Sequence, residues 1–224
     1  MNGVTNKSPK GKSAIAYKAI KDMIIKNEIK CGEIVSENKL AAMLSMSRTP
    51  IREAIHSLFE EGYVEVLKGI GILIKHVTIM EIRDVCSVRV LLESFAIRNS
   101  ADLIDPNRLD RISNQWSDLK KRIAEGAIDY KDELFALDGI THSIFFEYCG
   151  NEVLEQMFES LKIKVQRYQQ MFTKVTDDDI STSEQHIEIL NAVKNKNLDL
   201  ACELLNKHVF TPLNSLLSNS REIY

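Results

Sequence analysis

Residues 36–74 read SENKLAAMLSMSRTPIREAIHSLFEEGYVEVLKGIGILI, and this stretch decides the fold of the first part of the chain. Its apolar residues recur at helical spacing before and after the Ser-Met-Ser segment, so it predicts two short helices joined by a tight connection. Ser36 is a good N-cap for the first helix, and either Ser47 or Thr49 is one for the second. Pro50 then falls in the first turn of the second helix, where its missing N–H does no harm. This arrangement is typical of a helix-turn-helix.

Two β-prone runs, residues 63–66 and 72–74, follow the second helix. The segment between them contains Gly69 and Gly71, which permit a tight hairpin. An amphipathic helix is expected upstream, over residues 13–28. Three helices followed by a small β-hairpin are the pattern of a winged helix-turn-helix domain.

Beyond Val77 the apolar residues keep a helical spacing, and no strand pattern returns. Breaks at Asp-Pro, Gly and Asn-rich segments divide this part into six expected helices. Their expected ranges are about 79–101, 106–125, 130–148, 152–172, 180–194 and 198–217. We therefore expect a mainly α protein with a flexible N-terminus (1–12), a winged helix-turn-helix domain (13–76) and an all-α helical bundle (77–224).

The composition excludes several classes of protein. With 224 residues, 44% hydrophobic content and only nine Gly and four Pro, the chain is neither disordered nor collagen-like. Its four cysteines stand far apart with no CxxC pair, so we expect a reducing compartment and neither a zinc ribbon nor a disulfide framework. Because no signal-peptide pattern or long apolar run occurs, we expect a cytoplasmic protein without a membrane partner.

The net charge of -3 hides two parts of opposite sign. Residues 1–76 contain twelve Lys+Arg and eight Asp+Glu, which gives +4, whereas residues 77–224 carry -7. A basic front part suggests contact with a polyanion.

The second helix of a helix-turn-helix lies in the major groove of DNA with its first residues at the base edges. Ser47, Arg48, Thr49 and Arg52 give the corresponding turn a polar and cationic character. An arginine there is able to fork onto guanine or to contact phosphate. On residue chemistry alone, an ordinary solvated helix start with two surface arginines is an equal alternative.

Three of the five histidines, His142, His186 and His208, fall on three different expected helices, and Asp138 stands four residues before His142. An i, i+4 pair projects from one face of a helix, and histidines from neighbouring helices would complete a set of three nitrogens and one oxygen for a divalent cation. The alternative is that these histidines are surface or hydrogen-bonded residues without a metal.

The order of residues in the first part resembles the GntR family of bacterial transcription regulators. The resemblance rests on Ser36-Glu37-Asn38-Lys39-Leu40-Ala41, on Ser47-Arg48-Thr49-Pro50-Ile51-Arg52-Glu53-Ala54 and on the glycine wing. It implies a homodimer on a double-stranded, inverted-repeat operator, with Arg48 and Arg52 reading bases and the wing in the minor groove. The residues it assigns to DNA binding are Ser36, Asn38, Ser47, Arg48, Thr49, Pro50, Arg52, Lys68, Gly69 and Gly71.

The second part resembles the FCD effector domain of the FadR subfamily, through Leu137-Asp138-x-x-x-His142, Glu184-Gln185-His186 and His208. The resemblance implies an effector-binding and dimerisation domain in which Asp138, His142, His186 and His208 hold a divalent cation. Zinc suits this ligand set, and nickel or manganese are alternatives. A small organic acid would bind at the cation and to Arg89, although a salt bridge between Arg89 and Glu93 is an equal reading of that arginine.

These observations favour a ligand-responsive transcription regulator. A metal sensor, in which the cation itself is the signal, is the alternative. A metalloenzyme is disfavoured because the sequence has no HExxH, no GxSxG and no phosphate loop, and because an enzyme would leave the winged domain unexplained. We therefore expect a protein that is not an enzyme.

Overall fold

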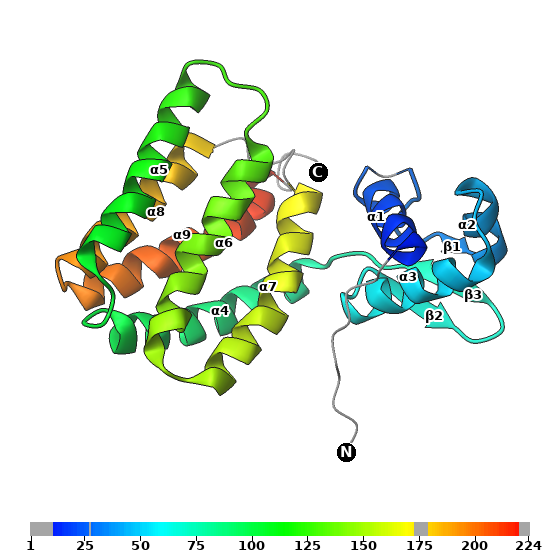
Figure 1. Cartoon of the computed structure of the whole chain (residues 1–224), viewed down its shortest axis with the longest axis horizontal. Helices are drawn as coiled ribbons and strands as arrows, with labels where there is room; N and C mark the ends of the chain where they lie inside the picture. The colour runs from blue at the N-terminus through cyan, green and yellow to red at the C-terminus, as the bar shows by residue number, and fades with distance from the viewer. Residues whose placement is uncertain (1–10, 27, 173–178, 220–224) are drawn as a thin grey trace. The chain divides into compact units, whose positions relative to one another are not determined.

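The structure is a computed structural model that describes residues 11–26, 28–172 and 179–219 (Figure 1). Its contacts divide the chain into two compact units, Met1–Val77 and Thr78–Tyr224. The expected flexible segment, residues 1–12, lies outside the described residues except for Gly11 and Lys12, and Lys12 already belongs to the first helix.

The first unit contains three helices and a three-stranded sheet. Its elements, in chain order, are α1 (Lys12–Ile25), β1 (Ile34–Val35), α2 (Glu37–Met43), α3 (Arg48–Glu60), β2 (Val64–Leu67) and β3 (Gly71–Ile74). The strands lie in the order β1-β3-β2 and all pair antiparallel. The expected hairpin is therefore present, but the sequence reading missed β1, which is too short to show an alternating pattern and forms by pairing with β3.

The core of this unit lies between α1, α3 and the sheet. Ile20, Leu40, Ile51, Leu58 and Tyr63 are fully buried there, and they come from all three helices and the start of the wing. Burial of such apolar side chains is the main force that holds a small domain together. The core therefore fixes α3 on the rest of the winged domain and leaves its opposite face in solvent.

Local signals set the ends of the elements. The Ser36 hydroxyl accepts a hydrogen bond from the backbone N–H of Lys39 at 3.1 Å and so caps α2, as expected. Glycine is required at position 71 for a steric reason. A Cβ there would lie 2.9 Å from the carbonyl oxygen of Val35. Only glycine therefore lets β1 approach β3 so closely.

The second unit is a bundle of helices among the residues described. Its helices are α4 (Ile79–Ser100), α5 (Pro106–Ala124), α6 (Lys131–Cys149), α7 (Glu152–Phe172), α8 (Asp179–Lys194) and α9 (Leu198–Asn219). α4 packs against α6, α7 and α9, and α8 packs between α5 and α9 (Figure 1). These ranges agree closely with the expected ones, and the mainly α fold class is confirmed.

Caps fix the two helices that matter most for the site. Thr78 and Glu81 form a reciprocal capping box at the start of α4. α6 ends at Gly150, whose φ of 66° is the left-handed conformation that glycine adopts without strain. These two signals define where α4 begins and where α6 ends.

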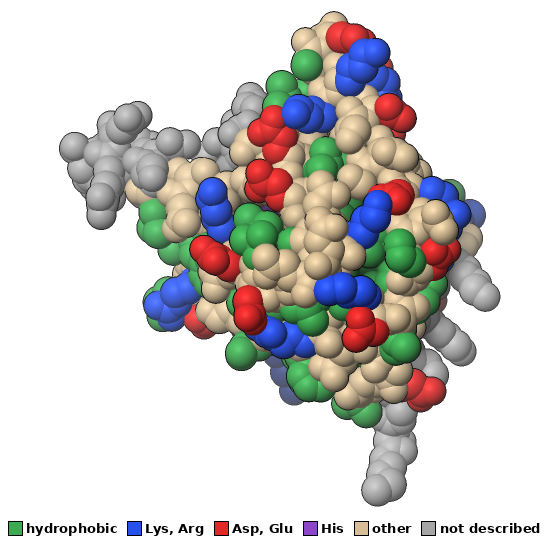
Figure 2. All heavy atoms as spheres, turned by 90° about the vertical axis from the view of Figure 1, so that its left-hand side faces the viewer, with side chains coloured by type: hydrophobic (Ala, Val, Ile, Leu, Met, Phe, Trp, Pro, Cys, Tyr) green, Lys and Arg blue, Asp and Glu red, His purple; other side chains and the backbone are tan. Residues whose placement is uncertain are grey.

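The surface of the helical unit is mixed in charge. On the face shown in Figure 2, acidic and basic side chains alternate with small hydrophobic areas. Ion pairs of Lys120 with Glu184 and of Lys194 with Asp110 connect α5 to α8. No helix within the described ranges is both long enough and apolar enough to cross a bilayer.

Candidate DNA interface and candidate metal centre

The first turn of α3 presents an exposed polar surface. Ser47 is the N-cap residue of α3, and Ser47, Arg48, Thr49 and Arg52 are all exposed. Because the helix N-terminus also offers free backbone N–H groups, this end of α3 has the donors that a phosphate or a base edge requires.

One carboxylate lies between the two arginines of this surface. Glu37, the first residue of α2, is 3.0 Å from the guanidinium of Arg48 and 2.8 Å from Nε of Arg52. Burial disfavours the charge of Glu37, but the hydrogen bonds and charges of the two arginines outweigh this and lower its pKa. The sequence analysis did not identify Glu37 as a site residue, although the tight connection between α2 and α3 places it near the first turn of α3.

The other residues assigned to DNA binding lie in three places. Asn38 is exposed on α2, and Lys68 and Gly69 are exposed in the turn of the wing. Gly71 has the structural role described above. Pro50 is buried, so its side chain supports the start of α3 and is not available at the exposed surface.

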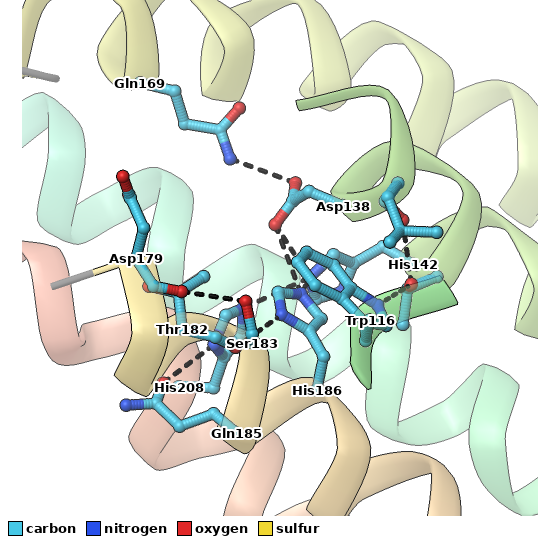
Figure 3. A network of polar contacts seen from close by, with 12 residues as sticks. Trp116, Asp138, His142, Gln169, Asp179, Thr182, Ser183, Gln185, His186 and His208 are labelled. Atoms are coloured by element: carbon cyan, nitrogen blue, oxygen red, sulfur yellow. Dashed lines mark hydrogen bonds and ion pairs between the residues drawn. The ribbon is translucent and has the colours of Figure 1, made fainter. Parts of the chain in front are cut away.

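The helical unit brings Asp138, His142, His186 and His208 together (Figure 3). All four are buried, and one ligand atom from each lies within 4.8 Å of the others. Nε2 of His142 is 3.3 Å from Nε2 of His186 and 3.3 Å from Nε2 of His208. Oδ1 of Asp138 is 3.3 Å from Nε2 of His186 and 3.6 Å from Nε2 of His142. Residues from α6, α8 and α9 thus form one buried cluster that could hold a metal.

The opposite nitrogen of each histidine faces a hydrogen-bond acceptor. Nδ1 of His142 is 2.5 Å from a carboxylate oxygen of Glu93, Nδ1 of His186 is 2.8 Å from the carbonyl oxygen of Thr182, and Nδ1 of His208 is 2.9 Å from Oε1 of Gln185. Each acceptor favours a proton on Nδ1, so the three Nε2 lone pairs converge. Lone pairs cannot hydrogen-bond to one another. A cation between the three Nε2 atoms would accept all three lone pairs.

The spacing also fits a metal. Four ligands at 2.0–2.1 Å from a tetrahedral centre lie about 3.3 Å from each other. The four separations given above are 3.3–3.6 Å, and all the ligand atoms lie within 4.8 Å of one another. Oδ2 of Asp138 accepts a hydrogen bond from Gln169 at 3.0 Å, which orients the carboxylate. The residues present therefore fit a small divalent cation with nitrogen and oxygen ligands.

Trp116 supports the cluster from α5. Its ring stacks on that of His186 with centroids 4.1 Å apart, and its indole N–H donates to the hydroxyl of Thr141 at 2.8 Å. Thr141 in turn donates to the carbonyl of Leu137. The buried hydroxyl of Thr141 thus has a partner in the buried indole.

The ionisable groups of the cluster influence one another. Burial opposes ionisation of Asp138, but His142 and His186 outweigh it and hold its pKa well below the usual value. Burial lowers the pKa of His186 and, more strongly, that of His208. Burial also disfavours the charged form of His142, but the neighbouring Glu93 outweighs burial and raises the pKa of His142. The cluster therefore combines two readily neutral imidazoles with a carboxylate that stays ionised.

A pocket lies beside the cluster, between α4, α6 and α7. Its polar lining is Arg89, Asp138, His142, Lys162, Gln166 and Gln169, and its apolar lining includes Phe135, Phe158 and Val165. Arg89 also donates from Nε to Glu93 at 2.7 Å, and both residues are buried. Arg89 therefore forms the salt bridge with Glu93 and also lines the pocket, and its role in binding an acid stays a prediction.

Comparisons with known proteins agree with this architecture. A family model described as "FCD domain" matches residues 84–211, and one described as "Bacterial regulatory proteins, gntR family" matches residues 12–74. Each match falls within one of the two compact units.

Relatives match along most of their length. The HTH-type transcriptional regulator YdhC of Bacillus subtilis (strain 168) is 26% identical over 86% of this chain and 85% of its own. The gluconate operon transcriptional repressor of the same organism is 27% identical, over 87% of this chain and 80% of its own. The solved structure of E. coli McbR/YncC superposes with a TM-score of 0.68, covering 95% of this chain and 100% of that one, at 17% identity. At that identity the structure supports the fold alone.

Proposed function

The chain belongs to the GntR family of bacterial regulatory proteins and carries an FCD domain, and from this premise we propose that it is a homodimeric regulator that senses a small organic acid at a metal centre. Like its relatives, it is a transcriptional regulator and not an enzyme. We assign it to the FadR subfamily because Arg89, Glu93 and the Asp-His cluster follow that pattern. The proposed site of action is the cytoplasm.

One observation carries the effector proposal. Three imidazole Nε2 atoms and one carboxylate oxygen converge in a buried site, while each Nδ1 faces an acceptor. We propose zinc as the cation, with nickel and manganese as alternatives, because the ligand set combines nitrogen and oxygen donors. When bound, the cation supplies a positive charge that attracts a carboxylate. Arg89 lines the adjoining pocket and would bind the same acid through its guanidinium.

The name of one relative, the gluconate operon transcriptional repressor, connects this group of proteins with an organic acid. That connection supports an acid as effector of this chain. It is also in keeping with the character of the pocket, which combines apolar walls with a few polar groups and a buried guanidinium.

DNA recognition is assigned to the winged domain. Arg48 and Arg52 would read base edges in the major groove, and Lys68 with Gly69 would approach the neighbouring backbone or minor groove. Because one recognition helix covers only a few base pairs, we propose a two-fold dimer on an inverted repeat.

A face of α4 supports the dimer. Val88, Leu91 and Phe95 recur at helical spacing and have exposed fractions of 41%, 71% and 50%. Exposed apolar side chains in one row are typical of a protein interface. We propose that a second copy of the chain covers this row.

The same helix would transmit the signal. Only four residues, 75–78, lie between the end of β3 at Ile74 and the start of α4 at Ile79. α4 also carries Arg89 on its buried side. An acid bound to Arg89 would thus act on the helix that continues from the winged domain and bears the proposed dimer face, and would bias the separation of the two recognition helices.

The test is a titration on selected DNA. Operator sequences are first selected from a random pool, and the zinc-loaded and the chelator-treated proteins are then titrated with and without gluconate or succinate. We expect an inverted repeat, two chains per operator, and an acid effect only with metal. An operator affinity that changes with zinc alone would favour the metal sensor, and one that responds to neither zinc nor acid would contradict both readings.

A further inference from the structure

Trp116 lies against the histidine cluster but is not one of its four residues (Figure 3). It is the single tryptophan of the chain, and its side chain is fully buried. The indole ring lies parallel to the imidazole of His186, with centroids 4.1 Å apart and an angle of 8° between the planes. The rings of His142 and His208 meet that imidazole at 72° and 64°. Of these three neighbouring rings, the indole alone is stacked on His186.

The imidazole of His186 is held differently from the other two at Nδ1. Nδ1 of His142, on α6, faces a side chain of α4, and Nδ1 of His208, on α9, faces a side chain of α8. The acceptor for Nδ1 of His186 is instead the carbonyl oxygen of Thr182, one turn earlier on its own helix. A hydrogen bond at one nitrogen leaves a ring free to turn about that bond, whereas a stacked partner fixes its plane. The indole thus gives His186 the support from a second helix that the other two histidines receive at Nδ1.

The indole is itself anchored to α6. Its N–H donates to the hydroxyl of Thr141 at 2.8 Å, and this hydroxyl donates to the carbonyl oxygen of Leu137 at 2.8 Å. Each of these two residues directly precedes a cluster residue, His142 and Asp138 respectively. Trp116 therefore connects the part of α6 that carries two cluster residues with the imidazole that α8 contributes.

The stack would also favour the metal-bound form of His186. Its imidazole would lose electron density to a cation bound at Nε2 and would become partly positive. The face of an indole carries negative charge and attracts a positive group within about 6 Å. A tryptophan that only filled a gap in the core would have no such preference between the two forms.

We infer that Trp116 is a positioning residue of the proposed metal centre, where it fixes the plane of the His186 imidazole so that Nε2 faces the other ligands. The inference rests on the proposed function, since it concerns the same cation site. Trp116 contacts a ligand and not the cation. Its effect is therefore on the affinity for the cation and on the geometry of its ligands, in addition to its share in the core.

The test measures zinc affinity by chelator competition in variants of the full-length protein. Trp116→Leu removes the stacked ring and should weaken zinc binding by about 10–100-fold, the usual cost of losing a side chain that supports a metal ligand. Trp116→Phe keeps an aromatic face but loses the N–H, and should bind zinc at least about threefold more tightly than Trp116→Leu. Thr141→Val keeps the indole and removes its hydrogen-bond acceptor, and should weaken zinc binding by about 3–10-fold.

Leu109→Ala is the matched control. Leu109 is buried on the same helix, seven residues before Trp116, which is about 10 Å of helix. This variant should lower the melting temperature of the metal-free protein, as Trp116→Leu does, and leave zinc affinity unchanged. Cobalt replaces zinc in a second measurement, because its visible absorption depends on the geometry of its ligands. The cobalt spectrum of Leu109→Ala should match that of wild type, and the spectrum of Trp116→Leu should differ.

The outcomes separate the inference from the metal centre itself. If Trp116→Leu lowers the melting temperature of the metal-free protein but keeps the wild-type zinc affinity and cobalt spectrum, Trp116 only fills the core. The inference is then wrong and the metal centre stands. If Trp116→Leu does not fold, Thr141→Val decides, and wild-type zinc affinity in that variant overturns the inference. If wild type binds neither zinc nor cobalt, the inference and the proposed function both fail.

Discussion

Nδ1 of His142 lies 2.5 Å from Oε2 of Glu93, and the other carboxylate oxygen of Glu93 accepts a hydrogen bond from Nε of Arg89 at 2.7 Å. Burial disfavours the charge of Glu93, but Arg89 and His142 outweigh it and lower its pKa. One buried carboxylate thus positions a proposed metal ligand and a proposed acid-binding group at the same time.

Glu93→Gln should weaken the binding of metal and of acid together. The amide retains an oxygen that accepts from His142 but loses the charge that balances Arg89. Loss of such an outer partner costs about 10–100-fold in metal affinity. A competition titration with a zinc chelator measures this, with the exposed Glu155→Gln as control. Wild-type zinc affinity in Glu93→Gln would show that the carboxylate has no such role.

Arg52→Ala should weaken binding to the selected operator by about 1–3 kcal/mol, because a side chain that forks onto a base is lost. Binding to unrelated DNA should fall much less. Arg83→Ala, an exposed arginine outside the winged domain, serves as the control. Gel-shift titrations on both DNAs give the comparison, and an unchanged operator affinity would remove Arg52 from the interface.

Glu37→Gln should strengthen binding to unrelated DNA, whereas Arg52→Ala weakens DNA binding. The carboxylate accepts from both Arg48 and Arg52, so removing its charge leaves the arginines freer to contact any phosphate. We expect tighter binding to unrelated DNA, a salt dependence steeper by about one unit of slope, and a lower specificity ratio. Glu28→Gln, exposed in the same unit, is the control. If Glu37→Gln keeps the wild-type ratio of operator affinity to affinity for unrelated DNA, Glu37 has only a structural role.

Metal affinity should fall as the pH is lowered. Each imidazole must be neutral to coordinate, so protons favour the metal-free protein. Burial lowers the pKa of His186 and, more strongly, that of His208, so protons compete at these two residues only below about 6.5, the ordinary histidine value. His142 has a raised pKa despite burial, because Glu93 stabilises its charge, and it should take up a proton first. Chelator competition at several pH values should therefore show a loss that begins above pH 6.5 and steepens below it. A pH-independent affinity would contradict this assignment of ligands.

Much of the fold could be predicted because local signals define it. Ser36 at the start of α2 and Gly150 at the end of α6 act within a few residues of the chain, so their effects are readable from sequence. β1 was missed because Ile34–Val35 is a strand only through its pairing with β3, about forty residues later.

For the candidate site, too, local sequence patterns predict some residues, and the others depend on tertiary packing. The i, i+4 spacing placed Asp138 and His142 on one face of α6, but only the packing of α8 and α9 brings His186 and His208 to them. The partners of the cluster depend on tertiary contacts too. Glu93 meets His142 across two helices, and Trp116 meets Thr141 across another pair, so no local pattern reveals either contact.

The metal content of the purified protein tests the central claim most directly. Elemental analysis of wild type should give one divalent cation per chain, and added zinc should raise the melting temperature of chelator-treated protein, since the unfolded chain cannot assemble ligands from three helices. His186→Ala should lose the metal and the acid response while it stays folded and binds operator DNA. If wild type contains no metal and zinc, nickel and manganese leave its melting temperature unchanged, the cluster is only structural and the proposed effector mechanism is wrong.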